Sequence, residues 1–144
     1  MATKKIPFDH ETPLVDFHPT IANWFIEQIG TPTDVQTASW PIIRSGEHAL
    51  IAAPTGSGKT LAAFLASIDS LFQQAISKDL TDQTQILYIS PLKALSNDVQ
   101  KNLRQPLSEI SARAVAAGLL LPEIRVEVRT GDTPTKTRQA ILKH

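Results

Sequence analysis

The stretch Ala53-Pro54-Thr55-Gly56-Ser57-Gly58-Lys59-Thr60 is the most informative part of this sequence. It matches the pattern G-x-x-x-x-G-K-S/T, except that alanine stands at the first position. The continuously apolar run 49–53 leads into it, and a helical pattern rich in alanine and leucine follows. A buried strand, a glycine turn and a helix in this order predict a phosphate-binding loop. The alternative is an ordinary glycine turn between a strand and a helix.

The residue types of this loop suit phosphate chemistry. Gly56 and Gly58 allow the backbone to turn its N–H groups toward phosphate oxygens, and the following helix directs its positive dipole end at the same anion. Lys59 is predicted to reach the β- and γ-phosphates of ATP, and the Thr60 hydroxyl is predicted to bind Mg²⁺. Lys59 and Thr60 are thus the catalytic candidates, and Thr60 is the metal ligand. The candidate cofactor-binding residues of the loop are Ala53, Pro54, Thr55, Gly56, Ser57, Gly58, Lys59 and Thr60.

Helical patterns alternate with short apolar runs on both sides of the loop. Helices are predicted over 19–29, 32–46, 59–74 and 92–118, and a last one opens at the turn 130–134. Pro41 should kink the second helix, and Pro106 should break the fourth. Strands are predicted over 49–53, 86–89 and 124–128, the first two buried on both faces. The predicted fold class is α/β, with a parallel sheet flanked by helices. Because the last helix ends without a cap, we expect a truncated domain.

Composition excludes some functions and leaves others open. The chain has 144 residues, of which 42% are hydrophobic, which is enough for one core. It has no cysteine, so disulfides and thiolate metal sites are excluded. The N-terminus lacks the unbroken apolar stretch of a signal peptide, and no apolar run is long enough to span a bilayer. A soluble, cytoplasmic protein is therefore expected.

The charges are unevenly distributed although the formal net charge is zero. Residues 1–90 contain five Lys/Arg and nine Asp/Glu, whereas residues 91–144 contain nine and five. This excess predicts salt-sensitive binding of nucleic acid, in part through Lys93. The alternative is an ordinary solvated helix surface.

Polar residues also mark three other segments. In Gly30-Thr31-Pro32-Thr33-Asp34-Val35-Gln36, the Gln36 amide can donate and accept together, which suits N6 and N7 of adenine. The alternative is that Gln36 is simply a polar residue on an amphipathic helix. The turns 90–98 and 130–133 offer phosphate ligands that are indifferent to base sequence, although ordinary capped turns are the alternative. The candidate nucleic-acid-binding residues are Pro91, Lys93, Ser96, Asn97, Thr130, Gly131 and Thr133.

Together these segments resemble a superfamily 2 helicase of the DExD/H type. The phosphate loop has the form found in these helicases, residues 30–36 resemble the Q motif, and 90–98 resemble motif Ia. Residues 130–133 resemble the next turn that contacts the nucleic-acid backbone. Ser-Pro-Leu-Lys-Ala-Leu and Arg-Thr-Gly-Asp-Thr-Pro are most similar to the large helicase-related (Lhr) family. The Q motif lacks its usual aromatic after the glycine; Phe17 is a candidate to stack on the base, and a core position is its alternative.

This resemblance implies a RecA-like motor that couples ATP hydrolysis to movement along single-stranded DNA and to unwinding, with a role in DNA repair. Residues 17–144 would be the N-terminal part of the first ATP-binding domain, after a lead-in at 1–16. The partners would be single-stranded DNA or RNA and the remainder of the same chain, including a second RecA-like domain, without a membrane. An RNA helicase, a duplex translocase and a non-catalytic binding module remain alternatives.

Hydrolysis also requires an acidic pair that holds Mg²⁺ and positions water. No apolar strand ending in Asp-Glu follows Thr60. We therefore expect the isolated chain to be catalytically inactive and to fold poorly, since the strand that carries such a pair packs in the sheet core.

Overall fold

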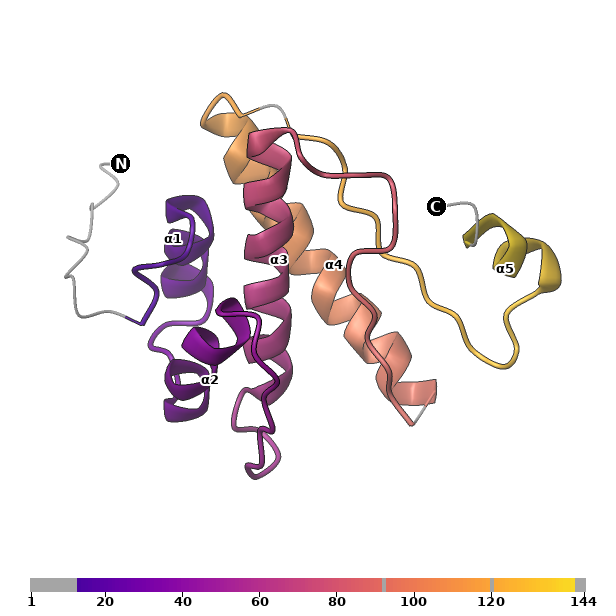
Figure 1. Cartoon of the computed structure of the whole chain (residues 1–144), viewed down its shortest axis with the longest axis horizontal. Coiled ribbons are helices and arrows are strands. Elements are labelled where there is room, and N and C mark those ends of the chain that lie inside the picture. Colours follow the sequence, from indigo (N-terminus) through magenta and orange to yellow (C-terminus); the bar gives the residue numbers. More distant parts are fainter. Residues whose placement is uncertain (1–12, 92, 120, 142–144) are drawn as a thin grey trace. The chain divides into compact units, whose positions relative to one another are not determined.

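A computed structural model describes residues 13–91, 93–119 and 121–141, and in the fourth helix it describes side chains from residue 103 onward. The described residues form helices joined by extended segments and turns (Figure 1). The helices are α1 (Pro19–Gln28), α2 (Asp34–Arg44), α3 (Lys59–Ser77), α4 (Lys93–Ala116) and α5 (Thr135–Ile141). The chain divides into two compact units, Met1–Asp69 and Ser70–His144, and α3 begins in the first and ends in the second. Most of the predicted lead-in, residues 1–12, lies outside the described residues.

The first unit is built on α1, α2 and the beginning of α3. Pro19 occupies the first turn of α1, where its missing N–H costs nothing, and His18 caps the helix by accepting from the Thr20 N–H. The predicted apolar face is confirmed at Ile21, Trp24 and Phe25, which are buried, whereas Ile29 is exposed. The buried hydrophobic residues of this unit are Leu14, Phe17, Ile21, Ala22, Trp24, Phe25, Trp40, Ala62, Phe64, Leu65, Ala66 and Ile68.

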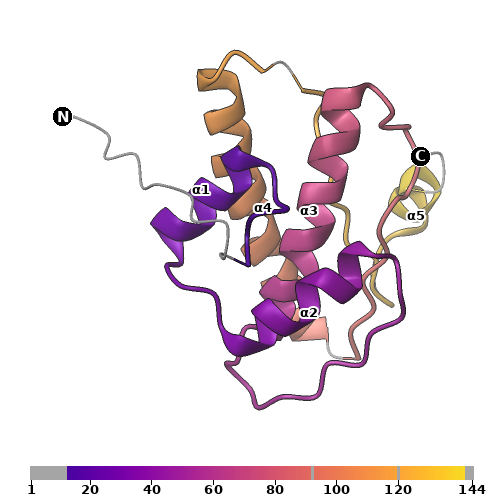
Figure 2. The ribbon, with the colours of Figure 1, turned by 60° about the vertical axis from the view of Figure 1, so that its left-hand side comes forward.

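A capping box starts α2. The Thr33 hydroxyl accepts from the Gln36 backbone N–H at 3.3 Å, and Gln36 Oε1 accepts from the Thr33 N–H at 2.9 Å. Pro41 lies inside the helix, which continues to Arg44. Figures 1 and 2 show α2 lying against the first turns of α3. There the fully buried Trp40 donates its indole N–H to the Ala62 carbonyl at 3.1 Å.

The second unit contains the end of α3 together with α4 and α5. Its buried hydrophobic residues are Phe72, Ala75, Leu107, Ile110 and Ala114, which repeat at helical spacing on α3 and α4. The predicted break at Pro106 is wrong, because α4 runs through it. One proline removes one backbone hydrogen bond, and Leu107, Ile110 and Ala114 bury the helix face that follows it. The last helix is confirmed as α5.

The predicted sheet is not confirmed. Residues 49–53, 86–89 and 124–128 are outside regular secondary structure, and the described residues form no strand. The expected burial of the first two runs is also wrong, since Leu50, Leu87 and Ile89 are 97%, 77% and 80% exposed. A strand exists only when its N–H and C=O groups pair with a neighbour, and these runs lack that pairing here. Apolar composition identifies a segment able to form a strand but does not provide its partner.

Candidate nucleotide site

The predicted phosphate loop is a tight turn between an extended segment and α3. Gly56 and Gly58 have φ angles of +81° and +86°, which only glycine adopts easily. Ser57 donates its N–H to the Pro54 carbonyl at 3.4 Å, and α3 begins at Lys59. The first N–H groups of a helix have no partner within it, so the end of this loop offers donors to an anion.

The Lys59 ammonium binds the carbonyls of its own loop. Its Nζ lies 2.5 Å from the Ala53 oxygen and 2.6 Å from the Pro54 oxygen. A phosphate in the loop would compete with these two carbonyls for the same ammonium, since a charged oxygen is the stronger acceptor. Thr60 is exposed at the start of α3, so its hydroxyl is accessible to a metal ion held by the phosphates.

Thr33 and Gln36 connect the start of α2 to the loop. The Thr33 hydroxyl donates to the Ser57 carbonyl at 2.9 Å, and the Gln36 Nε2 lies 3.5 Å from the Gly58 carbonyl. Gln36 is only 2% exposed, and its Oε1 already accepts from the Thr33 N–H. The amide predicted to bind adenine is thus held against the phosphate loop, and it must exchange these bonds to reach a base.

Gly58 fits closely against the same amide. A Cβ at this position would lie 2.6 Å from Gln36 Nε2 and 3.4 Å from the Thr33 hydroxyl, whereas a Cβ at Gly56 would meet nothing within 4 Å. The open side of the loop is therefore at Gly56, where a ligand can approach the backbone.

A partly buried ion pair joins the end of α2 to α3. The Asp69 carboxylate on α3 is fully buried, accepts from the His18 backbone N–H at 2.7 Å, and forms a salt bridge with Arg44 at the end of α2. Arg44 also donates to the Asp16 carbonyl at 2.5 Å and lies 4.8 Å from the centroid of the Phe17 ring. A buried carboxylate requires such partners, and together they fix α2 against α3.

Phe17 belongs to the core of this unit. It is 4% exposed, and its ring packs edge-on against Trp40 with centroids 4.9 Å apart. The core position, given above as the alternative to base stacking, is therefore the one observed.

The loop passes a simple test for binding a phosphate group. Ser57 Oγ is buried and has no hydrogen-bond partner among the described residues. A buried hydroxyl without a partner costs free energy, which a ligand that supplies the missing bond would recover. Lys59 and the first N–H groups of α3 provide further donors, and the open side at Gly56 gives a ligand access to them. The loop therefore fits an anionic ligand.

The predicted nucleic-acid-binding residues are described only in part. Pro91 is exposed beside Ser90, whose Oγ is buried without a partner among the described residues. Lys93, Ser96 and Asn97 lie in the first turns of α4, and their side chains are outside the described residues.

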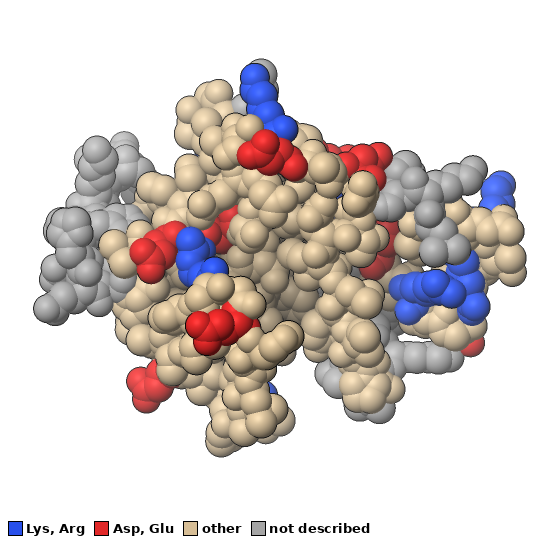
Figure 3. Space-filling model, in the orientation of Figure 1, with Lys and Arg blue, Asp and Glu red and all other residues tan. Residues whose placement is uncertain are grey.

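Thr130, Gly131 and Thr133 form a closed turn. Thr133 Oγ1 accepts from the Thr130 N–H at 2.8 Å, and Thr130 Oγ1 accepts from the Asp132 N–H at 3.3 Å. A Cβ at Gly131 would meet nothing within 4 Å, so this side of the turn is open to a ligand. Figure 3 shows Lys and Arg side chains gathered near α5. The helix itself contains Lys136 and Arg138.

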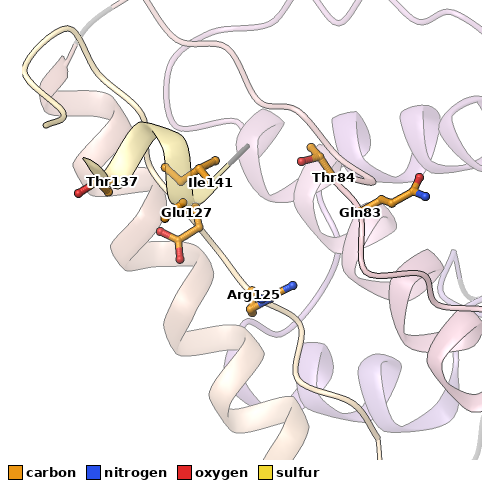
Figure 4. A pocket seen from close by; sticks show the side chains of 7 residues that line it. Gln83, Thr84, Arg125, Glu127, Thr137 and Ile141 are labelled. Atoms are coloured by element: carbon orange, nitrogen blue, oxygen red, sulfur yellow. The ribbon is translucent and has the colours of Figure 1, made fainter. Parts of the chain in front are cut away.

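A cavity of about 290 Å³ in the second unit is separate from the predicted residues. Figure 4 shows Arg125 and Glu127 from one extended segment, Thr137 and Ile141 from α5, and Gln83 and Thr84 from another segment around it. Ala140 completes its lining. The phosphate loop and the turn 130–133 contribute no residue to this lining.

The family model for the DEAD/DEAH box helicases matches residues 33–143, which include α2, the phosphate loop and both turns. The chain belongs to this family.

Relatives of this helicase chain include Lhr proteins. It is 47% identical over 130 residues to a Lhr helicase/probable uracil glycosylase of Mycolicibacterium smegmatis, covering 90% of this chain and 8% of that protein. It is 46% identical over 125 residues to the ATP-dependent helicase Lhr-Core of Saccharolobus solfataricus, covering 87% and 14%. A solved structure of Mycobacterium smegmatis helicase Lhr bound to ssDNA and AMP-PNP matches with a TM-score of 0.80 and 47% identity. That match covers 92% of this chain and 16% of the solved one, and it identifies the region as RecA-like.

The described part of this DEAD/DEAH box helicase chain contains neither a helix able to span a membrane nor a cluster of acidic or histidine metal ligands. In that part, no helix has the length and apolar character needed to cross a bilayer. Nor do three or more acidic or histidine side chains cluster there as metal ligands would. Sequence reasoning missed Thr33 as a contact of the loop and the Arg44–Asp69 pair as a link between α2 and α3. The sequence could have predicted a cationic partner for Asp69, because this carboxylate interrupts the apolar stripe of α3 and a buried charge requires an opposite charge.

Proposed function

We propose that this chain is the ATP-binding part of an ATP-dependent helicase that acts on single-stranded DNA, with residues 17–144 as the N-terminal part of the first RecA-like domain. Its activity would be ATP hydrolysis coupled to translocation and unwinding, in the cytoplasm and in the service of DNA repair. The observation that carries the proposal is the loop at 53–60, where two positive-φ glycines lead into α3 beside the Lys59 ammonium.

In this proposal Lys59, Ser57 and Thr60 have defined tasks. Lys59 leaves the carbonyls of Ala53 and Pro54 and binds the β- and γ-phosphates, while the N–H groups at the start of α3 bind the same anion. Ser57 Oγ, which has no hydrogen-bond partner among the described residues, gains one from the phosphate. The Thr60 hydroxyl holds Mg²⁺, which neutralises charge on the phosphate oxygens when it is bound.

Gln36 selects the base in this proposal. Its amide is next to the loop, so binding of adenine would exchange the bond to the Gly58 carbonyl for bonds to N6 and N7. Base recognition and the position of the phosphate loop would then depend on each other.

The turns 90–97 and 130–133 are proposed to contact the phosphates of one strand. Their polar atoms make no base-specific pattern, which suits translocation along any sequence. The relative solved in complex with ssDNA and AMP-PNP supports DNA as the polymer. An RNA helicase or a duplex translocase would use the same turns, and comparing poly-dT, poly-rU and duplex DNA as activators of the full-length ATPase separates them.

The nucleotide proposal is tested with the full-length natural protein. We expect AMP-PNP binding in the presence of Mg²⁺, and we expect Lys59→Ala to abolish it, since the variant loses the cation that faces the phosphates. Lys78→Ala, which removes an exposed charge after α3, is the matched control. Equal affinity of the Lys59→Ala variant and the wild type would refute the assignment.

A non-catalytic module is the second class of function. It would bind nucleotide through the same loop without turnover. For the isolated chain we expect no steady Mg²⁺-dependent ATPase, because no acidic pair on an apolar strand follows Thr60. DNA-stimulated turnover by the full-length protein supports the motor, and its absence supports the module.

A further inference from the structure

Arg138 is located in α5, and its guanidinium folds back onto the turn that precedes this helix. Nε donates to the Thr133 carbonyl at 2.7 Å. Nη2 donates to the Thr130 carbonyl at 3.3 Å and to the Gly131 carbonyl at 2.5 Å. One side chain thus binds three carbonyl groups of a short turn from two nitrogens of its planar guanidinium, whereas an ammonium presents all its donors from a single nitrogen.

These contacts change the charge that the turn exposes to an approaching anion. Carbonyl oxygens carry partial negative charge and repel phosphate, but the guanidinium binds those of Thr130, Gly131 and Thr133. The Thr130 and Thr133 hydroxyls close the turn from within by accepting backbone N–H groups. The space beside Gly131 stays open. Arg138 therefore fixes the backbone shape of the turn and offsets the partial negative charge of these three carbonyls, while the exposed Asp132 carboxylate remains in the turn.

We propose that Arg138 is a positioning residue for single-strand binding: it holds the turn 130–133 in the shape that receives a backbone phosphate, without contacting the phosphate itself. This role rests on the proposed function of the turn. The competing role is a direct phosphate ligand, which is what an arginine near nucleic acid most often is. The two roles differ because the Nε and Nη2 donors of Arg138 are already used within the turn.

The test uses the full-length protein and a fluorescent oligo-dT, titrated at several salt concentrations. Arg138→Ala is expected to weaken binding about tenfold at fixed salt, the order expected when a charged hydrogen-bonding group is removed. The slope of log affinity against log salt is expected to stay unchanged, whereas a lost phosphate contact lowers a single-strand slope by about 0.7. Arg138→Lys is expected to bind as weakly as Arg138→Ala, because one ammonium keeps the charge but cannot bridge the carbonyls.

Lys136→Ala is the control, since it removes an exposed charge from the same helix. Hydrogen exchange of the peptide 128–135 provides a second readout: exchange should accelerate in both Arg138 variants and not in the control. AMP-PNP affinity should be unchanged in all of them.

Three results would overturn the proposal: wild-type affinity in Arg138→Ala, a reduced salt slope, or recovery of affinity by Arg138→Lys. Failure of the wild type to bind oligo-dT refutes the proposed contact of the turn and this role with it. Wild-type binding with unaffected Arg138 variants refutes this role alone.

Discussion

Replacing Gly58 with alanine should disturb the phosphate loop more than replacing Gly56, although both glycines have nearly equal φ angles of +86° and +81°. A non-glycine residue in the left-handed region costs about 1–2 kcal/mol, and both variants carry this cost. Only at Gly58 does the new Cβ meet neighbours, at 2.6 Å from Nε2 and 3.2 Å from Cδ of Gln36.

The additional cost at Gly58 follows from how Gln36 is held. The side chain is 2% exposed and accepts from the Thr33 N–H, so it can move only by leaving its rotamer and this bond. An off-rotamer side chain costs about 0.5–1.5 kcal/mol and a lost hydrogen bond about 0.5–1.5 kcal/mol. Gly58→Ala should therefore lose about 2–5 kcal/mol of local stability, and Gly56→Ala about 1–2 kcal/mol.

Hydrogen exchange measured on peptides covering 33–45 and 54–66 gives the free energy of local opening in the full-length protein. The excess effect of Gly58→Ala should disappear in a Gln36→Ala background, because the clash partner is then absent. Equal losses in the two single variants, or an excess that persists without the Gln36 side chain, would refute this reasoning.

Three further predictions concern the support of the site. Asp69→Ala should destabilise the first unit by about 2–4 kcal/mol, less than for a fully buried pair because Arg44 is partly exposed; denaturation equal to wild type would contradict this. Partial burial lowers the pKa of His18, against an opposing effect of the Asp69 charge, so the folded state resists protonation. Stability should therefore be constant above about pH 6.5 and fall below it, and His18→Asn, whose amide oxygen can replace Nδ1 as the acceptor of the Thr20 N–H, should flatten this pH profile. Trp40→Phe should cost about 1–3 kcal/mol, since the Ala62 carbonyl loses its donor, and no change in local exchange of α3 would count against it.

Features that depend on neighbours along the chain were predicted correctly. Pro19 begins α1 as predicted, whereas α2 begins at Asp34 with Thr33 as its cap, two residues after the predicted start at Pro32. The glycine turn before Lys59 is likewise present with the backbone angles that its glycines permit. Such signals are readable because capping and turn formation involve residues three or four positions apart. The error at Pro106 arose because burial of the following helix face outweighs one missing hydrogen bond.

The sequence by itself determined most of the helices, the glycine turn before Lys59 and the resemblance to helicases, because these reside in local spacing and residue type. Only the tertiary structure decided that the Gln36 amide rests on the Gly58 carbonyl, that Asp69 pairs with Arg44, and that Arg138 closes the turn 130–133. Tertiary structure also decided that the apolar runs around Leu50 and Leu87 are exposed rather than paired. Each of these depends on which backbone group or charge lies opposite a side chain in space, and periodicity carries no information about that partner.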